Sequence, residues 1–412
     1  MKRDLERGGL SALLDRRGVR QALAALDAPG AETRLVGGCV RDALLGTPSA
    51  DIDLATTLLP EEVIAAAGRT PGLKAVPTGI EHGTVTLVTE DGPIEVTTLR
   101  EDVETDGRHA VVRFGHDFAR DAERRDFTVN ALSLGPDGRL HDTVGGLPDL
   151  EAGRVRFIGD PATRIREDAL RILRFFRFHA RFGGAPPDAE ALAACVAARD
   201  SLDRLSRERV RAEFLKLLAA SGGAALVATL SGTGLLLRIT GGVGELGRLE
   251  RASAAKLSPI LRLAALAVGA RHDADRLQVR LRLSKSEHAQ LTDYAKVLAV
   301  LHDRAALDGA ALRALAAQHG LAPLVDALTI VAGEPRPALT GDARSVLDAL
   351  GGEGGSPVFP LAGADLVAAG IAPGPAIGRG LAAARKVWLE RGCPTGAAAR
   401  ADLLARALDS AR

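Results

Sequence analysis

Two aspartates separated by one isoleucine, Asp51 and Asp53, have the spacing that points most directly to chemistry. In a β-strand, residues i and i+2 face the same side, so both carboxylates project together while Ile52 points into the core. Such neighbouring charges repel unless a cation lies between them, and Mg²⁺ prefers oxygen ligands. A second β-like run, PIEVTTL, adds Glu95 as a buried or half-buried acid. Three carboxylates on neighbouring strands can hold two metal ions for phosphoryl or nucleotidyl transfer.

A pair of glycines precedes the acidic pair. Gly37 and Gly38 lie between an apolar strand and a predicted helix that carries Arg41 in its first turn. Glycines there let backbone N–H groups approach a phosphate closely, and the arginine adds a fork of donors. An ordinary strand-to-helix turn would also contain such glycines, but the nearby acidic pair favours phosphate binding.

The segment RRDFTVNAL offers a further polar group. Asp126 could be an N-cap and the arginine pair a solvated rim. In the functional interpretation, Arg125 binds phosphate, and Asp126 and Asn130 bind ribose hydroxyls.

The predicted helix over 163–182 carries one acid and several arginines at helical spacing. A solvated face usually mixes Lys, Glu and Arg, so this composition favours recognition of a ligand. Cytosine and adenine both present an amino donor beside a ring-nitrogen acceptor, which an Asp acceptor and an Arg donor complement. Asp168 and Arg171, one helical turn apart, could form that pair, and the other arginines would neutralise phosphates. The charged stripe consists of Asp168, Arg171, Arg174, Arg177 and Arg181.

The elements that must position these residues change character along the chain. Residues 1–30 have the spacing of a helix. From 31 to about 150, short β-like runs alternate with turns and a helical piece at 60–67, which predicts a mixed α/β domain. From about 161 to 412 the pattern is almost wholly helical, and GGEGGSP at 351–357 is a candidate linker or turn. The β-like runs are RLVGG, DIDLAT, HGTVTLVT, PIEVTTL and FTVNALSL.

Composition and hydropathy patterning exclude membrane, secreted, collagenous and disordered proteins. The chain has 412 residues, enough for two to four domains, and only 3% are aromatic, so Leu, Val, Ile and Ala must build the cores. Three cysteines without motif spacing argue against a disulfide framework or a cysteine-type zinc site. No secretory leader or membrane-spanning run is evident, so we expect a cytoplasmic protein without a membrane partner. The formal net charge is +1, yet eight arginines and three acids lie between Arg154 and Arg181, where a polyanion could bind.

Four motifs in this order, GGxVRD, the DxD of DIDLATT, RRDFTxNAL and EDxLRxLRxxRF, resemble those of the bacterial class II tRNA nucleotidyltransferase and poly(A) polymerase family. The resemblance is strong over 31–215 and continues through LDRLSRERVRAEFLKLL at 202–218 and a tail pattern at 363–381. It implies an α+β fold, in which a small mixed head domain with a β-sheet and helices precedes all-α domains. The implied domains are a head at 1–150, a neck at 151–225, a body at 226–350 and a tRNA-binding tail at 351–412.

The resemblance also implies template-independent addition of C, C and A to the tRNA 3′ end from CTP and ATP, by two-metal-ion catalysis with Mg²⁺ and without a DNA partner. Asp51 and Asp53 would bind the metal, and Glu95 would activate the attacking 3′-hydroxyl. By the same resemblance, Arg174 and Arg177 would face the nucleotide and its phosphates. The implied nucleotide-binding residues are Gly37, Gly38, Arg41, Arg125, Asp126, Asn130, Asp168, Arg171, Arg174 and Arg177.

Alternatives remain open from the sequence. A poly(A) polymerase shares the head motifs, although DIDLATT followed by Pro60 and two glutamates is more typical of the CCA-adding branch. Enzymes that add only CC or only A are a further alternative, and a non-catalytic RNA-binding relative is disfavoured by the three intact carboxylates. His272-Asp273 and His302-Asp303 lack the additional ligands of a phosphohydrolase site. The C-to-A switch is expected to involve loop 101–112, and no oligomeric state is predicted.

Overall fold

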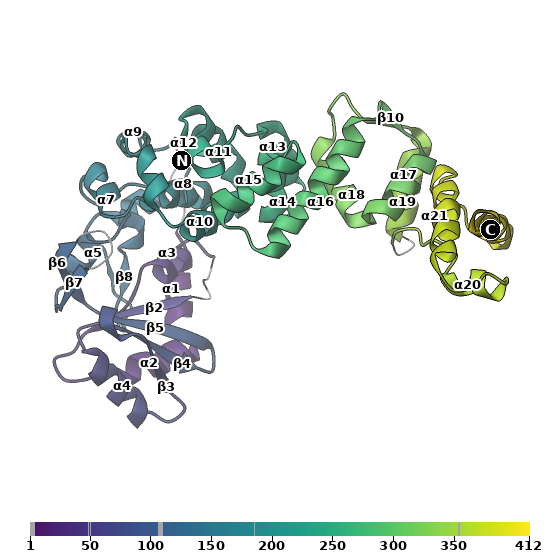
Figure 1. Ribbon diagram of the computed structural model, residues 1–412. Coiled ribbons are helices and arrows are strands. Elements are labelled where there is room, and N and C mark those ends of the chain that lie inside the picture. The colour runs from purple at the N-terminus through teal and green to yellow at the C-terminus, as the bar shows by residue number, and fades with distance from the viewer. Residues whose placement is uncertain (1–4, 48, 50, 106–109, 185, 353–354) are drawn as a thin grey trace. The chain divides into compact units, whose positions relative to one another are not determined.

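The chain folds into two compact units, Met1–Arg238 and Ile239–Arg412 (Figure 1). The first unit contains a mixed sheet with helices and the second is almost entirely helical, which confirms the predicted α+β class. The predicted division into head, neck, body and tail at 150, 225 and 350 stays a prediction. The structure is a computed structural model that describes residues 5–47, 49, 51–105, 110–184, 186–352 and 355–412.

A seven-stranded sheet in the order β3-β4-β5-β2-β1-β8-β9 forms the base of the first unit. Its central strands β2 and β5 pair in parallel, whereas the other neighbours are antiparallel. Strands β6 and β7 form a separate antiparallel pair that contains most of the predicted loop 101–112, and residues 106–109 of that loop lie outside the described residues. The strands are β1 Thr33–Val36, β2 Ile52–Thr56, β3 Lys74–Gly79, β4 Thr84–Thr89, β5 Gly92–Thr98, β6 Arg100–Thr105, β7 Ala110–Phe114, β8 Ser133–Leu134 and β9 Leu140–His141.

The predicted strand FTVNALSL is mostly not a strand. Residues Thr128–Asn130 form a 3₁₀ turn, and only the last two residues of the segment enter the sheet as β8. The reason is local, because the Asp126 side chain accepts hydrogen bonds from the Phe127 backbone N–H and the Asn130 amide. Such bonds compete with strand pairing.

The helices of the first unit differ from the prediction at two places. The helix expected over 1–30 is two helices, α1 and α2, because Arg16 between them has an extended ψ of 131°. The helix expected over 163–182 is also two, α7 and α8, separated at Asp168. The helices are α1 Arg7–Leu14, α2 Arg17–Ala25, α3 Gly38–Leu44, α4 Pro60–Arg69, α5 Phe118–Glu123, α6 Gly146–Glu151, α7 Pro161–Glu167, α8 Arg171–Phe182, α9 Ala189–Ala197, α10 Arg207–Ala219, α11 Gly223–Gly232 and α12 Leu235–Thr240, the last of which runs across the unit boundary.

Phenylalanines join α8 to the segments before β8 and after β9. The rings of Phe127 and Phe157 have centroids 4.7 Å apart, and Phe175 of α8 stacks on Phe157 at 5.9 Å. Phe178 meets Phe127 edge-on at 5.5 Å. All four side chains are buried, so this cluster fixes the polar face of α8 next to the sheet.

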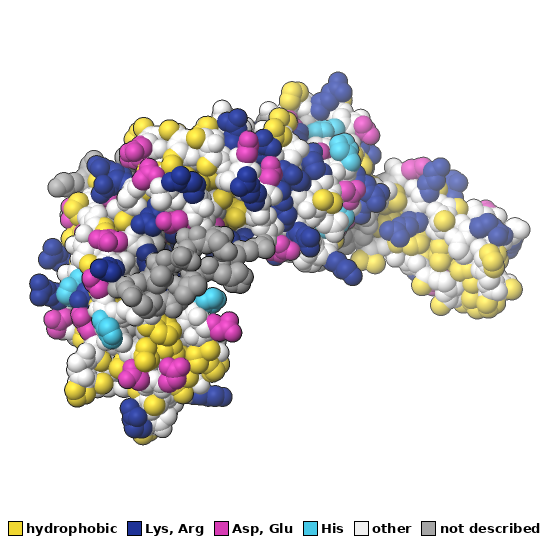
Figure 2. Space-filling view, turned by 60° about the vertical axis from the view of Figure 1, so that its left-hand side comes forward, with side chains coloured by type: hydrophobic (Ala, Val, Ile, Leu, Met, Phe, Trp, Pro, Cys, Tyr) yellow, Lys and Arg dark blue, Asp and Glu magenta, His cyan; other side chains and the backbone are white. Residues whose placement is uncertain are grey.

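The second unit packs helices around apolar side chains such as Leu291, Leu298 and Trp388. No helix in the described ranges is long and apolar enough to span a membrane. On the face shown in Figure 2, basic side chains are interspersed with acidic ones, as expected for a net charge of +1. The elements are α13 Leu246–Ala254, α14 Pro259–Ala267, α15 Arg271–Leu281, α16 Lys285–His302, β10 Ala306–Leu307, α17 Gly309–His319, α18 Leu321–Val331, β11 Ala338–Leu339, α19 Gly341–Gly352, α20 Gly363–Ala368, α21 Pro375–Glu390 and α22 Ala397–Ala411.

Candidate nucleotide-binding site

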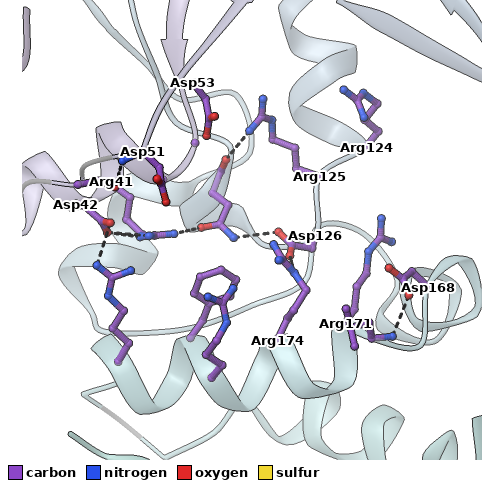
Figure 3. Close-up of a pocket in the computed structure, with 18 of the residues that line it drawn as sticks. Arg41, Asp42, Asp51, Asp53, Arg124, Arg125, Asp126, Asp168, Arg171 and Arg174 are labelled. Carbon is purple, nitrogen blue, oxygen red and sulfur yellow. Dashed lines mark hydrogen bonds and ion pairs between the residues drawn. The ribbon is translucent and has the colours of Figure 1, made fainter. Parts of the chain in front are cut away.

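A pocket of about 580 Å³ in the first unit brings together all the predicted site residues except Glu95 (Figure 3). Its lining contains eight arginines and five aspartates, so the pocket has a net positive charge suited to a polyanion. The lining residues are Gly37, Gly38, Arg41, Asp42, Ser49, Asp51, Asp53, Arg124, Arg125, Asp126, Asn130, Asp168, Leu170, Arg171, Arg174, Arg177, Phe178, Arg181 and Arg209.

The acidic pair lies at the start of β2. Ile52 is buried, as predicted, while Asp51 is exposed and Asp53 half-buried. Glu95 lies opposite Asp53 in the parallel β2–β5 register. Contrary to the sequence expectation, Glu95 is exposed, because its strand alternates buried Ile94 and Val96 with outward-facing residues.

The electrostatics of Asp53 fit a cation ligand. Burial raises its pKa, and the neighbouring charges of Glu95 and Asp51 raise it further, against an opposing effect of Arg125. A carboxylate in this position is short of positive charge, and its oxygens are suitable donors for a hard divalent ion. Among the side chains that the structure describes, no three His, Cys, Asp or Glu residues form a group able to hold a metal. Asp51 and Asp53 stay the candidate protein ligands because both carboxylates line the pocket.

The turn before α3 requires a glycine at its first position. Gly37 has a φ of +73°, in the left-handed region, and a Cβ there would lie 2.8 Å from the Arg125 guanidinium. The absence of a side chain thus lets Arg125 reach across the turn, where it donates to the Asn130 carbonyl oxygen at 3.3 Å.

A chain of hydrogen bonds crosses the pocket from α3 to α8. Arg41 donates to the Asn130 side-chain oxygen, and the Asn130 amide donates to Asp126 Oδ1 at 3.0 Å. Arg174 Nε donates to Asp126 Oδ2 at 2.6 Å. Although burial opposes it, the charge and hydrogen bond of Arg174 and the hydrogen bond from Asn130 keep the pKa of Asp126 below its ordinary value. Asp126 is therefore an ionised, buried bridge between the RRDF segment and α8.

Asp168 interrupts the helix on which base recognition was predicted. It adopts an extended conformation, with φ −152° and ψ 106°, and its Oδ1 accepts the Leu170 N–H at 3.0 Å. Its Oδ2 binds Arg209 of α10 at 2.7 Å, whereas Arg171 pairs with Glu167. Both side chains line the pocket, but they are not paired with each other.

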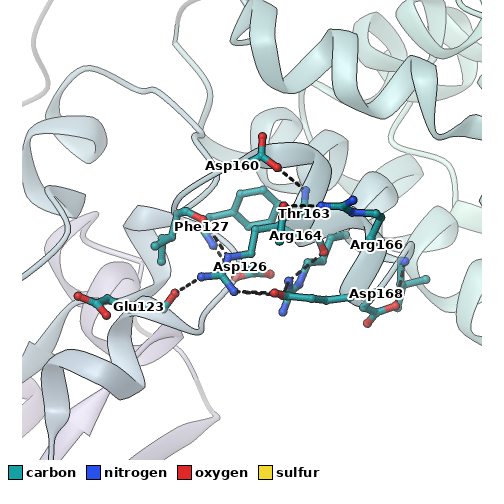
Figure 4. Close-up of polar contacts among 12 residues, drawn as sticks. Glu123, Asp126, Phe127, Asp160, Thr163, Arg164, Arg166 and Asp168 are labelled. Carbon is teal, nitrogen blue, oxygen red and sulfur yellow. Dashed lines mark hydrogen bonds and ion pairs between the residues drawn. The ribbon is translucent and has the colours of Figure 1, made fainter. Parts of the chain in front are cut away.

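Polar contacts around the break hold α7 in place (Figure 4). Arg164 donates to the backbone oxygen of Ile158 at 2.9 Å and to that of Glu123, and it pairs with Glu167 at 3.1 Å. In the sequence, Arg164 is one of several basic residues in this segment. Its contact with Glu123, 41 residues away, leaves no pattern that the local sequence could reveal.

All eight pocket arginines form ion pairs with protein carboxylates. Sequence analysis gave no role to four of the carboxylate partners, Asp42, Asp121, Glu167 and Glu213, or to Arg209, although Asp42 directly follows Arg41 in GGxVRD. The pairs are Arg41–Asp42, Arg181–Asp42, Arg124–Asp121, Arg125–Asp121, Arg171–Glu167, Arg174–Asp126, Arg177–Glu213 and Arg209–Asp168.

Comparison with known proteins identifies relatives of the chain. Residues 33–156 match the family described as poly A polymerase head domain, and residues 187–240 match the probable RNA and SrmB-binding site of polymerase A. The chain is 36% identical over 380 residues to CCA tRNA nucleotidyltransferase 1, mitochondrial, of Danio rerio, covering 87% of this chain and 83% of the relative. It is 32% identical over 377 residues to the CCA-adding enzyme of Limosilactobacillus fermentum, with 90% and 92% covered.

A solved structure is similar over nearly the same length. The crystal structure of the Bacillus stearothermophilus CCA-adding enzyme in complex with CTP has a TM-score of 0.68 and 26% sequence identity, and covers 91% of this chain and 92% of that one. The head-domain match and the fold define a nucleotidyltransferase. The chain belongs to the family of CCA tRNA nucleotidyltransferases, also called CCA-adding enzymes. Nucleotidyltransferases of this family normally need a divalent metal ion.

Proposed function

We propose that this chain adds C, C and A to the 3′ end of tRNA, using CTP and ATP and releasing pyrophosphate at each addition. One observation carries the proposal: residues from three distant segments, around Asp51, Asp126 and Asp168, converge on one arginine-rich pocket beside an acidic pair. The relatives named above, which share most of the chain's length, support the same activity.

We propose for the site residues the roles that the family resemblance implies. Asp51 and Asp53 would hold Mg²⁺, which lowers the pKa of the attacking 3′-hydroxyl and stabilises charge on pyrophosphate when bound. Glu95, exposed opposite Asp53 in the β2–β5 register, would accept the hydroxyl proton. Gly37, Gly38 and Arg41 would contact the triphosphate.

The rest of the pocket would hold the nucleoside. Arg125 would bind phosphate, while Asp126 and Asn130, already joined by a hydrogen bond, would hold the ribose side. Asp168 and Arg171 would form the acceptor and donor that match C and A. Arg174 and Arg177 would face the nucleotide and its phosphates.

Base binding then requires the pocket to share or exchange contacts. The Oδ2 of Asp168 is bound to Arg209, and Arg171 is bound to Glu167. Each carboxylate oxygen has two lone pairs, so Asp168 can accept a base amino group without losing Arg209. Arg171 has five N–H donors and can likewise add a base contact.

The direct test is incorporation of labelled CTP and ATP, singly and together, into tRNA transcripts that end at the discriminator base, at C and at CC. We expect CTP to add two residues to the first transcript and ATP then to add one and stop. Unlimited extension by ATP alone would identify a poly(A) polymerase. Stopping at CC, or acting only on CC ends, would identify a split-function enzyme. No incorporation, with tRNA binding intact, would identify a non-catalytic relative. The cytoplasmic location stays a prediction.

A further inference from the structure

Asp42 is the most buried carboxylate of the pocket, and both of its oxygens bind arginines. Its side chain is only 3% exposed. Oδ1 accepts hydrogen bonds from Arg41 at 2.9 and 2.7 Å, and Oδ2 accepts one from Arg181 at 3.0 Å. Arg41 lies on α3, whereas Arg181 lies at the end of α8, 139 residues from Asp42 in sequence. A single carboxylate therefore ties two walls of the pocket together.

Arg41 is confined by these contacts. Its guanidinium lies 5.1 Å from the ring centroids of both Phe178 and Phe182, and its third polar contact is the Asn130 side chain. The contacts with Asp42 and Asn130 occupy three of its five N–H donors. One N–H on each terminal nitrogen is left for a ligand, so Asp42 determines which edge of the guanidinium is available.

Arg181 contributes a second guanidinium to the same end of the pocket. Its side chain is 44% exposed and lines the pocket, and it lies one helical turn beyond Arg177 on α8. Because Arg41 and Arg181 share one carboxylate, their separation is fixed before any ligand arrives. Two fixed cations around a single anion leave a net positive charge, which suits a phosphate chain.

We propose that Asp42 is a positioning residue for triphosphate recognition, which holds Arg41 and Arg181 at a fixed spacing so that their remaining N–H groups face one polyphosphate. This inference rests on the proposed function, since a nucleoside triphosphate is the ligand. Asp42 does not contact the triphosphate itself, because two anions repel. Its role is specific to the phosphate chain, so the nucleoside contacts should not depend on it.

The test compares the binding of CTP and CMP by calorimetry with Mg²⁺ and without tRNA, so that no transfer occurs. Asp42→Asn keeps the shape of the side chain but removes its charge and turns an amide N–H₂ toward an arginine. We expect this change to weaken CTP binding by about tenfold or more, because charge-assisted contacts are lost. Binding of CMP should stay within about twofold, because the contacts to the nucleoside are unchanged.

Asp149 offers a matched control. It is also buried, at 4% exposure, and pairs with two arginines, Arg154 and Arg156, but it does not line the pocket. Asp149→Asn should lower the melting temperature without changing the ratio of CTP to CMP affinity. Arg181→Gln, at a partly exposed position, keeps the proposal testable if Asp42→Asn does not fold. It should weaken CTP binding by a smaller factor and leave CMP binding unchanged.

Several results would overturn the proposal. Equal weakening of CTP and CMP by Asp42→Asn would assign Asp42 a general structural role. Unchanged CTP binding in both Asp42→Asn and Arg181→Gln would remove any role in recognition, as would the same CTP-specific loss in Asp149→Asn. An unmodified protein that binds CTP no more tightly than CMP would also contradict it. Failure of the proposed function would instead appear as no incorporation by the unmodified protein, a result that the binding ratio does not depend on.

Discussion

The surroundings of Asp53 disfavour its negative charge, and this affects both the stability of the protein and metal binding. Burial, Glu95 and Asp51 raise its pKa. A carboxyl group whose pKa is raised in the folded state contributes stability below its ordinary pKa, and this stability is lost as the pH rises through the raised pKa. At neutral pH the ionised Asp53 therefore destabilises the metal-free protein, and a bound cation would reverse the effect.

Replacing Asp53 with asparagine should separate stability from activity. We expect Asp53→Asn to raise the melting temperature of the metal-free protein at neutral pH, since the unfavourable charge is gone. Mg²⁺ should raise the melting temperature of the unmodified protein but not that of the variant, and nucleotide incorporation should fall by orders of magnitude. Asp27→Asn, at an exposed position, is the control and should change neither quantity. A lower melting temperature for metal-free Asp53→Asn would contradict this account.

Side-chain directions set by the local period could be predicted, whereas hydrogen-bond partners that are distant in sequence could not. The two-residue period of a strand places Asp51 and Asp53 around a buried Ile52, as the structure shows. In contrast, Asp42 binds an arginine 139 residues away, and Asp168 binds one 41 residues away. No local pattern encodes such pairs, because they form only when α8 and α10 pack in the tertiary structure.

At the scale of elements, α1 supports α3 through a close backbone contact. Gly9 of α1 faces α3, where a Cβ would lie 2.2 Å from the Ala43 carbonyl oxygen. The preceding Gly8 has no atom within 4 Å of such a Cβ. A side chain therefore fits at Gly8 but not at Gly9. Of the two, only Gly9 controls the position of α3, the helix that carries Arg41.

This difference predicts opposite effects of the same substitution. Gly9→Ala should destabilise the first unit by about 1–3 kcal/mol, because backbone must move to admit the methyl group. Gly8→Ala should be neutral or stabilise by up to about 1 kcal/mol through helix propensity. Urea unfolding of both variants, followed by hydrogen exchange in peptides from α3, measures the difference. Equal unfolding free energies for the two variants would show that the α1–α3 contact is not tight.

Element types followed from the sequence where periodicity was strong, and failed where side chains cap the backbone. The run TVTLVT alternates clearly and forms β4, whereas FTVNALSL has similar composition but turns at Asn130. The latter and the break at Asp168 have one cause, an aspartate side chain that binds a nearby backbone N–H. Asp126 and Asp168 therefore mark two places where periodicity alone misleads.

At the scale of the whole molecule, the two units have separate polar centres. All the residues lining the nucleotide pocket belong to the first unit. In the second unit, Glu334 binds Arg248 at 2.7 and 2.8 Å and Arg251 at 2.7 Å. Hydrogen bonds from Arg248 keep the pKa of Glu334 below its ordinary value, even though burial opposes this. The ionised Glu334 therefore stabilises the folded protein at a pH above the ordinary pKa of a glutamate. This contribution is lost as the pH falls through the lowered pKa of Glu334.

The two units should therefore respond to different changes. Glu334→Gln should destabilise the second unit by about 2 kcal/mol, because charge-assisted hydrogen bonds are lost, and the loss should disappear at acid pH. CTP should protect only peptides of the first unit. Hydrogen exchange resolved by peptide measures both, with Asp293→Asn in the exposed Asp293–Lys296 pair as the control. Loss of CTP protection in Glu334→Gln would show that the two centres are coupled.

The three cysteines have a practical consequence for studying the enzyme. Cys39, Cys195 and Cys393 are free and buried, and burial raises their pKa values to about 11, 12 and 11. Alkylating reagents attack the thiolate, so these side chains are protected both by access and by protonation. A cysteine introduced at an exposed position would be the single reactive thiol of the chain. Fluorescent or spin labels can therefore be attached to such an introduced cysteine without first removing Cys39, Cys195 or Cys393.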